Sequence, residues 1–144
     1  MSHTEEDVQM SLESGIAAFE AKHFSTAMQL LSPLAEEGNA EAQYRLAIMC
    51  QNGLGVARNQ QLGVKWMRAA AEQGLAIAQH GLGFMYLEGE GVEKSGEQAV
   101  VWFQKAAEQG LVGSQATLGR MYEEGLGVEQ DAEEARKWYK KAGF

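Results

Sequence analysis

The apolar positions of the chain follow a helical period and stop at regular intervals. Within segment 78–86 they are separated by four, three and one residues, which places them on one face of a helix. A Gly-Glu-Gly break follows at 89–91, and a second periodic stretch runs from about residue 96 to residue 110. The pattern predicts two helices joined by a glycine-rich loop. The apolar residues are Ala78, Leu82, Met85 and Tyr86 in the first stretch and Ala99, Trp102, Phe103 and Ala106 in the second.

The same pair of stretches recurs along the chain. Trp66, Trp102 and Trp138 are spaced 36 residues apart, and their neighbours keep the same register. Self-similarity at a fixed period is typical of proteins built from stacked structural repeats. Other residues that recur in this register are Gln43, Gln79 and Gln115; Leu46, Leu82 and Leu118; Met49, Met85 and Met121; and the Gly-x-Gly-Val segments that start at Gly53, Gly89 and Gly125.

Four such units account for the sequence as one domain over residues 1–144. The first unit lacks the Gly-x-Gly-Val loop, and Ser32-Pro33 is expected to bend or shorten its second helix, because proline removes a backbone donor. Gly15, Ala18 and Ala27 are spaced similarly to the small positions of a 34-residue tetratricopeptide repeat. The predicted units are a degenerate repeat that resembles this type at 5–38 and regular repeats at 39–74, 75–110 and 111–144. The predicted N-caps of their second helices are Asn59, Ser95 and Asp131.

These motifs resemble a known repeat family. The pattern is Leu82-Gly83-x-Met85-Tyr86-x-x-Gly89-x-Gly91-Val92, then Ala99-x-x-Trp102-x-x-Lys105-Ala106-Ala107-x-x-Gly110, and it is similar to the Sel-1-like repeat of the tetratricopeptide superfamily. The resemblance implies an all-α fold, a right-handed α-solenoid of four helix-turn-helix repeats. It also implies a non-catalytic scaffold for protein–protein contacts, often in bacterial signalling, envelope assembly or host interaction. Some members carry a cysteine pair in each repeat, whereas this chain has Cys50 alone.

Charge and composition narrow the classes of partner. The formal net charge of −8 disfavours nucleic acid and anionic membranes, both of which need clustered basic residues. One cysteine cannot form an intrachain disulfide, and the polar, acidic start does not resemble a secretion signal. No run approaches the roughly 18 apolar residues of a membrane span. We therefore expect a cytoplasmic protein.

Candidate chemistry is sparse. His3, His23 and His80 fall in different units without a helical partner, so no zinc spacing results. No nucleophile with an adjacent base is evident, so we expect no catalytic residue, no metal and no cofactor. Free cysteine is among the most buried residue types, and Cys50 is interpreted as a core residue, although an oxidisable thiol is the alternative. The three tryptophans are interpreted as packing between helices and not as a platform for a ligand.

Variation at fixed register indicates a binding surface. In the superfamily the first helix of each unit lines the concave side of the solenoid, where we expect a groove for a peptide or protein segment. An apolar centre in an acidic protein favours a ligand with apolar anchors and some basic character. The alternative is that these side chains simply pack on one another. The predicted groove residues are Tyr44, Ile48, Gln51, His80, Phe84, Leu87 and Arg120.

A second hypothesis is self-association. No further polar helix follows the last unit in this sequence, and solenoids normally cover such a face for solubility. A homodimer joined through Trp138, Tyr139 and Phe144 would cover it. An enzyme is the least favoured of the three functional classes, because no convergent site is visible.

Overall fold

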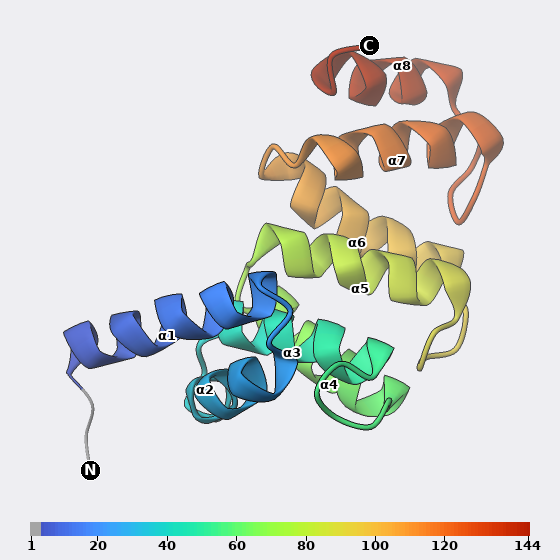
Figure 1. Cartoon of the computed structure of the whole chain (residues 1–144). Coiled ribbons are helices and arrows are strands. Elements are labelled where there is room, and N and C mark those ends of the chain that lie inside the picture. Colours follow the sequence, from blue (N-terminus) through green and yellow to red (C-terminus); the bar gives the residue numbers. More distant parts are fainter. Residues whose placement is uncertain (1–3) are drawn as a thin grey trace. The chain divides into compact units, whose positions relative to one another are not determined.

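The computed structural model describes residues 4–144, and all regular secondary structure in that range is helical (Figure 1). This confirms the all-α fold class. Six of the eight described helices have the same length of 13 residues, as a fixed repeat requires. The helices are α1 (Glu5–Glu20), α2 (Phe24–Glu36), α3 (Ala40–Asn52), α4 (Gln60–Glu72), α5 (Ala76–Glu88), α6 (Gly96–Glu108), α7 (Val112–Glu124) and α8 (Ala132–Lys141).

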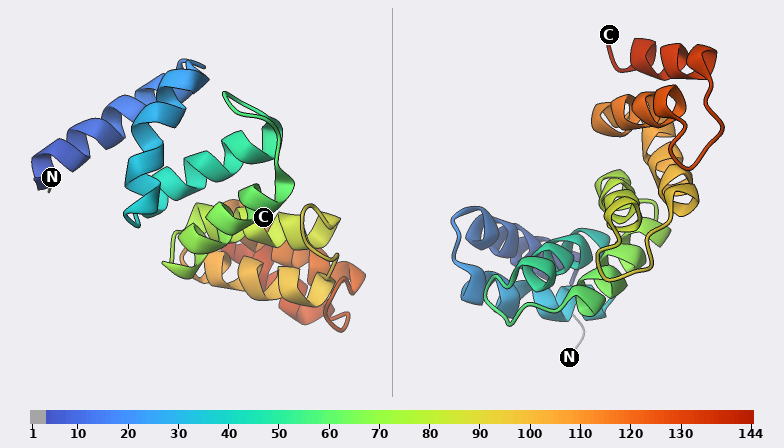
Figure 2. Two further views of the ribbon diagram at one scale, coloured as in Figure 1. Left: turned by 90° about the horizontal axis from the view of Figure 1, so that it is seen from below. Right: turned by 90° about the vertical axis from the view of Figure 1, so that its right-hand side faces the viewer.

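The helices form two compact units, divided after Gln73. The first unit contains the hairpins α1–α2 and α3–α4, and the second contains α5–α6 and α7–α8 (Figures 1 and 2). Within each unit the second helix of one hairpin packs against the first helix of the next, α2 on α3 and α6 on α7. Each hairpin thus buries its apolar face against its neighbour in the same unit, as helical repeats do.

Local sequence signals set where the helices begin and end. The predicted N-caps Asn59, Ser95 and Asp131 each accept a hydrogen bond from a backbone N–H of the following helix. The first helix of each regular repeat ends at a left-handed glycine, for example Gly89 with φ +73°. The chain then folds back, since the Ser95 N–H donates to the Tyr86 carbonyl at 2.9 Å. These bonds close the loop between the two helices of a hairpin.

The second glycine of the loop fits against the preceding hairpin. Gly127 has φ +71°, and a Cβ atom there would collide with the backbone of Gly96 at the start of α6. In the first unit, a Cβ on Gly55 would lie 2.7 Å from the Phe24 carbonyl carbon at the start of α2. The loop therefore needs glycine both for its dihedral angles and for its close approach to a helix terminus.

The core of the second unit centres on Phe103, which is fully buried. A side chain on Gly83 would place its Cβ 2.9 Å from the Phe103 ring, so the missing side chain lets α5 and α6 approach closely. Of the three tryptophans, Trp138 is buried with 5% exposure, while Trp66 and Trp102 are half-buried. The tryptophans are thus buried to different extents, and Phe103 occupies the centre of this core.

The second helix of the first unit is not shortened, contrary to the expectation from Ser32-Pro33. Helix α2 keeps the 13-residue length of its counterparts with Pro33 inside it. The Ser32 hydroxyl donates to the Met28 carbonyl at 2.6 Å, one turn earlier, and so provides a local donor beside the proline. Leu31 and Leu34 are buried on either side, and their packing holds the last turn in place.

Glutamine pairs connect the two helices of a hairpin. The Gln73 side chain donates to Gln43 Oε1 at 2.8 Å and to the Gly38 carbonyl at 2.9 Å. One repeat later, Gln109 donates to Gln79 Oε1 at 2.9 Å and to the Gly74 carbonyl at 2.8 Å. We call each of these arrangements a glutamine clasp.

The last hairpin has no glutamine clasp. The register of Gln109 falls at position 145, and the sequence runs to Phe144. Gln115, in the register of Gln79, still donates to the Ala107 carbonyl at 3.1 Å, but its buried Oε1 atom has no hydrogen-bond partner. The clasp is therefore described in two hairpins, α3–α4 and α5–α6.

Candidate functional site

The second unit contains a cleft of about 330 Å³ that is lined mainly by residues of α5 and α7, the first helices of its two hairpins. Three of the predicted groove residues line it, Phe84 and Leu87 from α5 and Arg120 from α7. The remaining lining residues are Glu88, Thr117, Met121 and Leu126. The lining is thus an apolar floor with one basic and one acidic side chain, which is the composition of a site for a polypeptide or another amphipathic ligand.

Aromatic packing fixes the position of Phe84. Its ring stands edge-to-face against His80 and Phe103, with centroids 4.9 Å and 5.0 Å away. His80 in turn shares a 2.6 Å hydrogen bond between Nδ1 and the Ser114 hydroxyl of α7. Burial lowers the pKa of His80, so the ring is held in its neutral form. His80 is itself half-buried, and its ring contact with Phe84 helps to hold Phe84 in position.

The charged groups of the cleft are unequally neutralised. Arg120 Nε lies 3.5 Å from Glu124 Oε2, and both side chains are largely exposed. On the α5 side, a hydrogen bond with Glu90 raises the pKa of Glu88. Two carboxyl groups that lie this close hold a proton more readily than one alone, and they would also favour a cation between them. Arg120 is thus paired with Glu124, and Glu88 is hydrogen-bonded to Glu90.

The other predicted groove residues lie in the first unit. Tyr44, Ile48 and Gln51 are half-buried on α3. The Arg45 guanidinium lies 4.9 Å from the ring centroid of Phe19 and 5.9 Å from that of Tyr44. The seven predicted groove residues are divided between the two compact units, and each unit is described by itself. A groove that contains all seven residues therefore stays a prediction.

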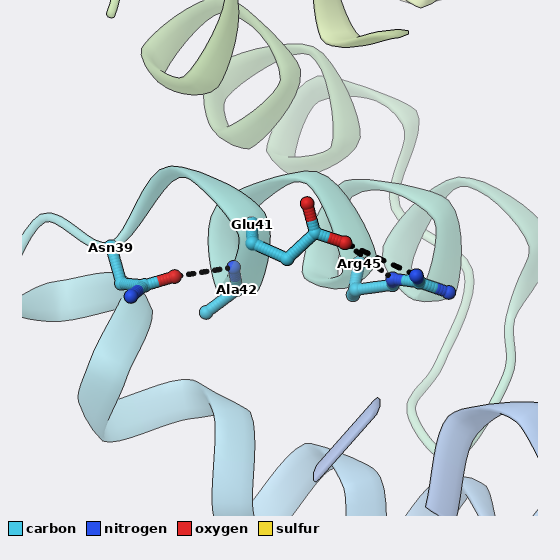
Figure 3. A network of polar contacts seen from close by, with 4 residues as sticks. All are labelled: Asn39, Glu41, Ala42 and Arg45. Atoms are coloured by element: carbon cyan, nitrogen blue, oxygen red, sulfur yellow. Dashed lines mark hydrogen bonds and ion pairs between the residues drawn. The ribbon is translucent and has the colours of Figure 1, made fainter. Parts of the chain in front are cut away.

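The start of α3 is held by local polar contacts. Asn39 Oδ1 accepts from the Ala42 N–H at 3.0 Å, and Arg45 binds Glu41 at 3.1 Å one turn along the helix (Figure 3). These bonds position the Arg45 guanidinium beside the aromatic rings of this face. Burial raises the pKa of the Tyr44 hydroxyl, and the Arg45 charge opposes that rise.

The residues predicted for self-association differ in exposure. Phe144 is 82% exposed and stands edge-on to the half-buried Tyr139, with ring centroids 6.0 Å apart. Trp138 is 5% exposed and belongs to the core of the second unit, so it offers little surface to a partner. Of the three, Phe144 is the residue that a partner could reach most easily.

The titratable side chains outside the cleft do not converge. Cys50 is buried, as predicted, and burial raises the pKa of its thiol. His23 is exposed at the start of α2, and His3 lies outside the described residues. Over residues 4–144, no group of three His, Cys, Asp or Glu side chains could hold a metal ion. Among the helices of that range, none is long and apolar enough to cross a membrane.

Besides Glu88, four contributions to the cleft were not among the predicted groove residues. Thr117, Met121 and Leu126 were not predicted as lining residues, and Ser114 was not predicted as the partner of His80. Leu126 had a usable signal, because the middle position of the Gly-x-Gly loop is leucine in two repeats and Glu90 in the other. Ser114 had none, since its hydroxyl acquires a role only through the side chain that faces it from α5.

Helical hairpins that stack within each unit, three of them closed by a left-handed glycine loop, define a helical repeat protein. The Sel1 repeat family model matches residues 40–75, 76–111 and 113–143, and the chain belongs to this family. Among the curated proteins compared with the chain, none matches significantly.

Solved structures show the same fold. A Sel1 repeat protein from Oxalobacter formigenes is 36% identical with a TM-score of 0.87, over 92% of this chain and 53% of its own. The protein c5321, a protective antigen of uropathogenic Escherichia coli with an SLR fold, is 40% identical with a TM-score of 0.89, over 94% of this chain and 30% of its own. Both neighbours are bacterial, and the chain spans about half the length of one and under a third of the other.

Proposed function

We propose that the chain is a non-catalytic interaction module that binds a polypeptide segment in the cleft lined by α5 and α7. Sel1 repeat proteins generally act as scaffolds for protein–protein interaction, and this chain carries three such repeats. The observation that carries the proposal is the convergence of Phe84, Leu87 and Arg120 on one cleft. Phe84 is already fixed by its neighbours, so little side-chain entropy is lost when a ligand covers it.

The ligand we propose has an apolar anchor next to a basic side chain. The apolar anchor would lie against Phe84 and Leu87 and exclude water from them. The basic side chain would meet Glu88, the acidic residue of the cleft lining, because Arg120 is already paired with Glu124. The net charge of −8 favours the approach of the same ligand.

A displayed peptide library tests this proposal. We expect selection on the purified chain to enrich peptides with an apolar residue beside Lys or Arg. Fluorescence anisotropy then measures the affinity of one enriched peptide. Leu87→Gln should weaken that affinity by roughly tenfold or more, since it removes an anchor contact worth about 1–3 kcal/mol. The change is compatible with the fold, because Gln51 occupies the same register in the first unit.

A matched variant separates the cleft from the rest of the surface. Val101 is 46% exposed on α6 and does not line the cleft, and lysine occupies its register at Lys65 and Lys137. Val101→Lys should bind the peptide as the wild type does. Phe84→Glu combined with Tyr44→Glu extends the test to the groove predicted across both units. If Leu87→Gln and Val101→Lys bind the peptide equally well, the cleft is not the site.

Self-association is a second candidate function. The last hairpin contains the exposed Phe144. It also contains two buried polar atoms without hydrogen-bond partners, Gln115 Oε1 and Trp138 Nε1. Contact with a second copy would cover Phe144 and Tyr139. Sedimentation equilibrium at micromolar concentration should then show a dimer that Phe144→Ser converts to a monomer. A monomeric wild type would remove this candidate.

A further inference from the structure

The first unit contains a second cleft, on different helices from the peptide cleft. It has a volume of about 300 Å³ and is lined by residues of α2, α3, the following loop and α4. Cys50 and Trp66 are on its wall, and Glu36 and Lys65 contribute the charged groups. The other lining residues are Met28, Ser32, Leu46, Val56 and Leu62. We call this cavity the Cys50 cleft.

The second unit shows what normally fills this place. Two repeats, or 72 residues, further along the chain, tyrosine stands in the register of Cys50 as Tyr122. Tyr122 packs against a core cluster that contains Val100, Leu118 and Trp138. These three residues are in the registers of Met28, Leu46 and Trp66, which line the Cys50 cleft. The same scaffold thus holds an aromatic ring in one unit and a cleft in the other.

Trp66 and Trp138, which stand in the same register two repeats apart, differ in burial. Trp138, in the unit with tyrosine, is 5% exposed, whereas Trp66, in the unit with cysteine, is half-buried. A cysteine side chain is smaller than a tyrosine by the whole phenol ring, and helices of fixed spacing do not close such a gap fully. The Cys50 cleft is therefore an aromatic position from which the ring is missing.

The charges around the cleft favour a neutral occupant. Glu36 and Lys65 contribute one charge of each sign, so a charged side chain would gain from one and lose to the other. The walls are Leu, Val, Met, Cys and Trp side chains, which suit a flat apolar ring. Met28 and Cys50 add polarisable sulfur, which contacts aromatic rings favourably.

We propose that the Cys50 cleft binds an aromatic side chain of a partner polypeptide, with tyrosine preferred. The ring would take the position that Tyr122 occupies in the second unit. The cleft would take one ring, with the hydroxyl toward the polar rim at Ser32 and Glu36. This site lies in the other unit from the peptide cleft and does not rest on the function proposed for it. The two proposals can therefore fail separately.

The test is a titration of the ¹⁵N-labelled chain with N-acetyl-tyrosinamide, followed by NMR. We expect saturable shifts at the amides of Cys50 and Val56 and at the Trp66 indole N–H, with a dissociation constant on the order of 1 mM for so small a ligand. N-acetyl-lysinamide should cause no saturable shift there. Absence of saturable shifts with the tyrosine probe, or shifts confined to the second unit, would overturn the proposal.

Two variants separate the cavity from the thiol. Cys50→Ala keeps the cleft open and should bind the probe, whereas Cys50→Tyr fills it with the residue of the equivalent repeat position and should abolish binding. Leu62→Glu places a charge at the cleft and is compatible with the fold, because Glu134 occupies that register. It should weaken binding at least tenfold, and it keeps the test available if Cys50→Tyr does not fold. Equal binding by the wild type and Leu62→Glu would contradict the proposal.

Discussion

At the scale of single residues, the glutamine clasp provides a donor for a buried acceptor. Gln79 is buried, and its Oε1 atom is satisfied by Gln109, whereas the corresponding atom of Gln115 has no partner. A buried acceptor that loses its donor retains its desolvation penalty. The glutamine clasp therefore contributes to stability chiefly by preventing that penalty.

Gln109→Ala tests the clasp. The variant leaves Gln79 Oε1 and the Gly74 carbonyl without their donor, and we expect the free energy of unfolding to fall by about 1–3 kcal/mol. Gln104→Ala is the matched control on the same helix, since it removes only an exposed bond to Glu108 and should change stability by about 0.5 kcal/mol or less. Urea unfolding of both variants measures the difference. Equal effects would show that the clasp has no special role.

His80 gives the stability a pH dependence of defined sign. Burial lowers its pKa in the folded state, while the unfolded chain titrates near 6.5. Below about pH 6.5 the unfolded state binds the proton more readily, so the contribution is complete above that pH and is lost as the pH falls. His80→Tyr, which copies Tyr44, removes the titrating group. Thermal unfolding should therefore show a smaller loss between pH 7.5 and pH 5 than in the wild type, and an identical loss would contradict the assignment.

At the scale of elements, the loop between the helices of a hairpin is held by sterics as well as by dihedral angles. Gly127 and Gly110 both have positive φ, +71° and +93°. Only Gly127 has backbone within reach of a new Cβ, because nothing lies within 4 Å of one at Gly110. A comparison of the two positions therefore separates the cost of backbone strain from the cost of disturbing the loop contact.

Alanine substitutions at these two glycines measure each effect. Gly110→Ala should cost about 1–2 kcal/mol, the strain of a left-handed L-residue. Gly127→Ala should cost a further 1–3 kcal/mol or so, because the loop must move off the start of α6. Chemical denaturation of the two variants supplies the comparison. A smaller cost at Gly127 than at Gly110 would mean that the loop contact is not tight.

Burial ranks the aromatic residues of α6 differently from their recurrence in the sequence. Phe103 is fully buried and contacts His80 and Phe84, whereas the recurrent Trp102 is half-buried with Lys105 Nζ 5.4 Å from its ring centroid. Phe103→Ala should therefore cost about 3–5 kcal/mol and Trp102→Ala less. Melting temperatures test the order, and a larger drop for Trp102→Ala would reverse it.

The elements could be predicted from the sequence because their signals are local. Asn59, Ser95 and Asp131 cap helices through bonds to residues two or three positions away, and Gly89 ends one by its own dihedral angles. The cleft could be predicted only in part. Its lining combines side chains from separate elements, such as Leu87 of α5 and Leu126 of the loop after α7, and no local sequence pattern predicts that combination.

At the scale of the whole molecule, the chain repeats one hairpin and varies the side chains on it. The shared positions form the cores, so differences between repeats determine the surfaces on which a partner could bind. In the second unit, Leu87 stands in the register of Gln51, and Arg120 stands in the register of Ile48. Leu87 and Arg120 give that unit an amphipathic cleft. In the first unit, cysteine in place of tyrosine gives an aromatic-sized one.

Mapping a selected peptide on the ¹⁵N-labelled chain by NMR tests the central claim most directly. The account predicts saturable shifts at the amides of Phe84, Leu87, Arg120 and Leu126, with the amide of Val101 unmoved. Shifts that cluster on the opposite faces of α6 and α8 and spare these four residues would contradict it.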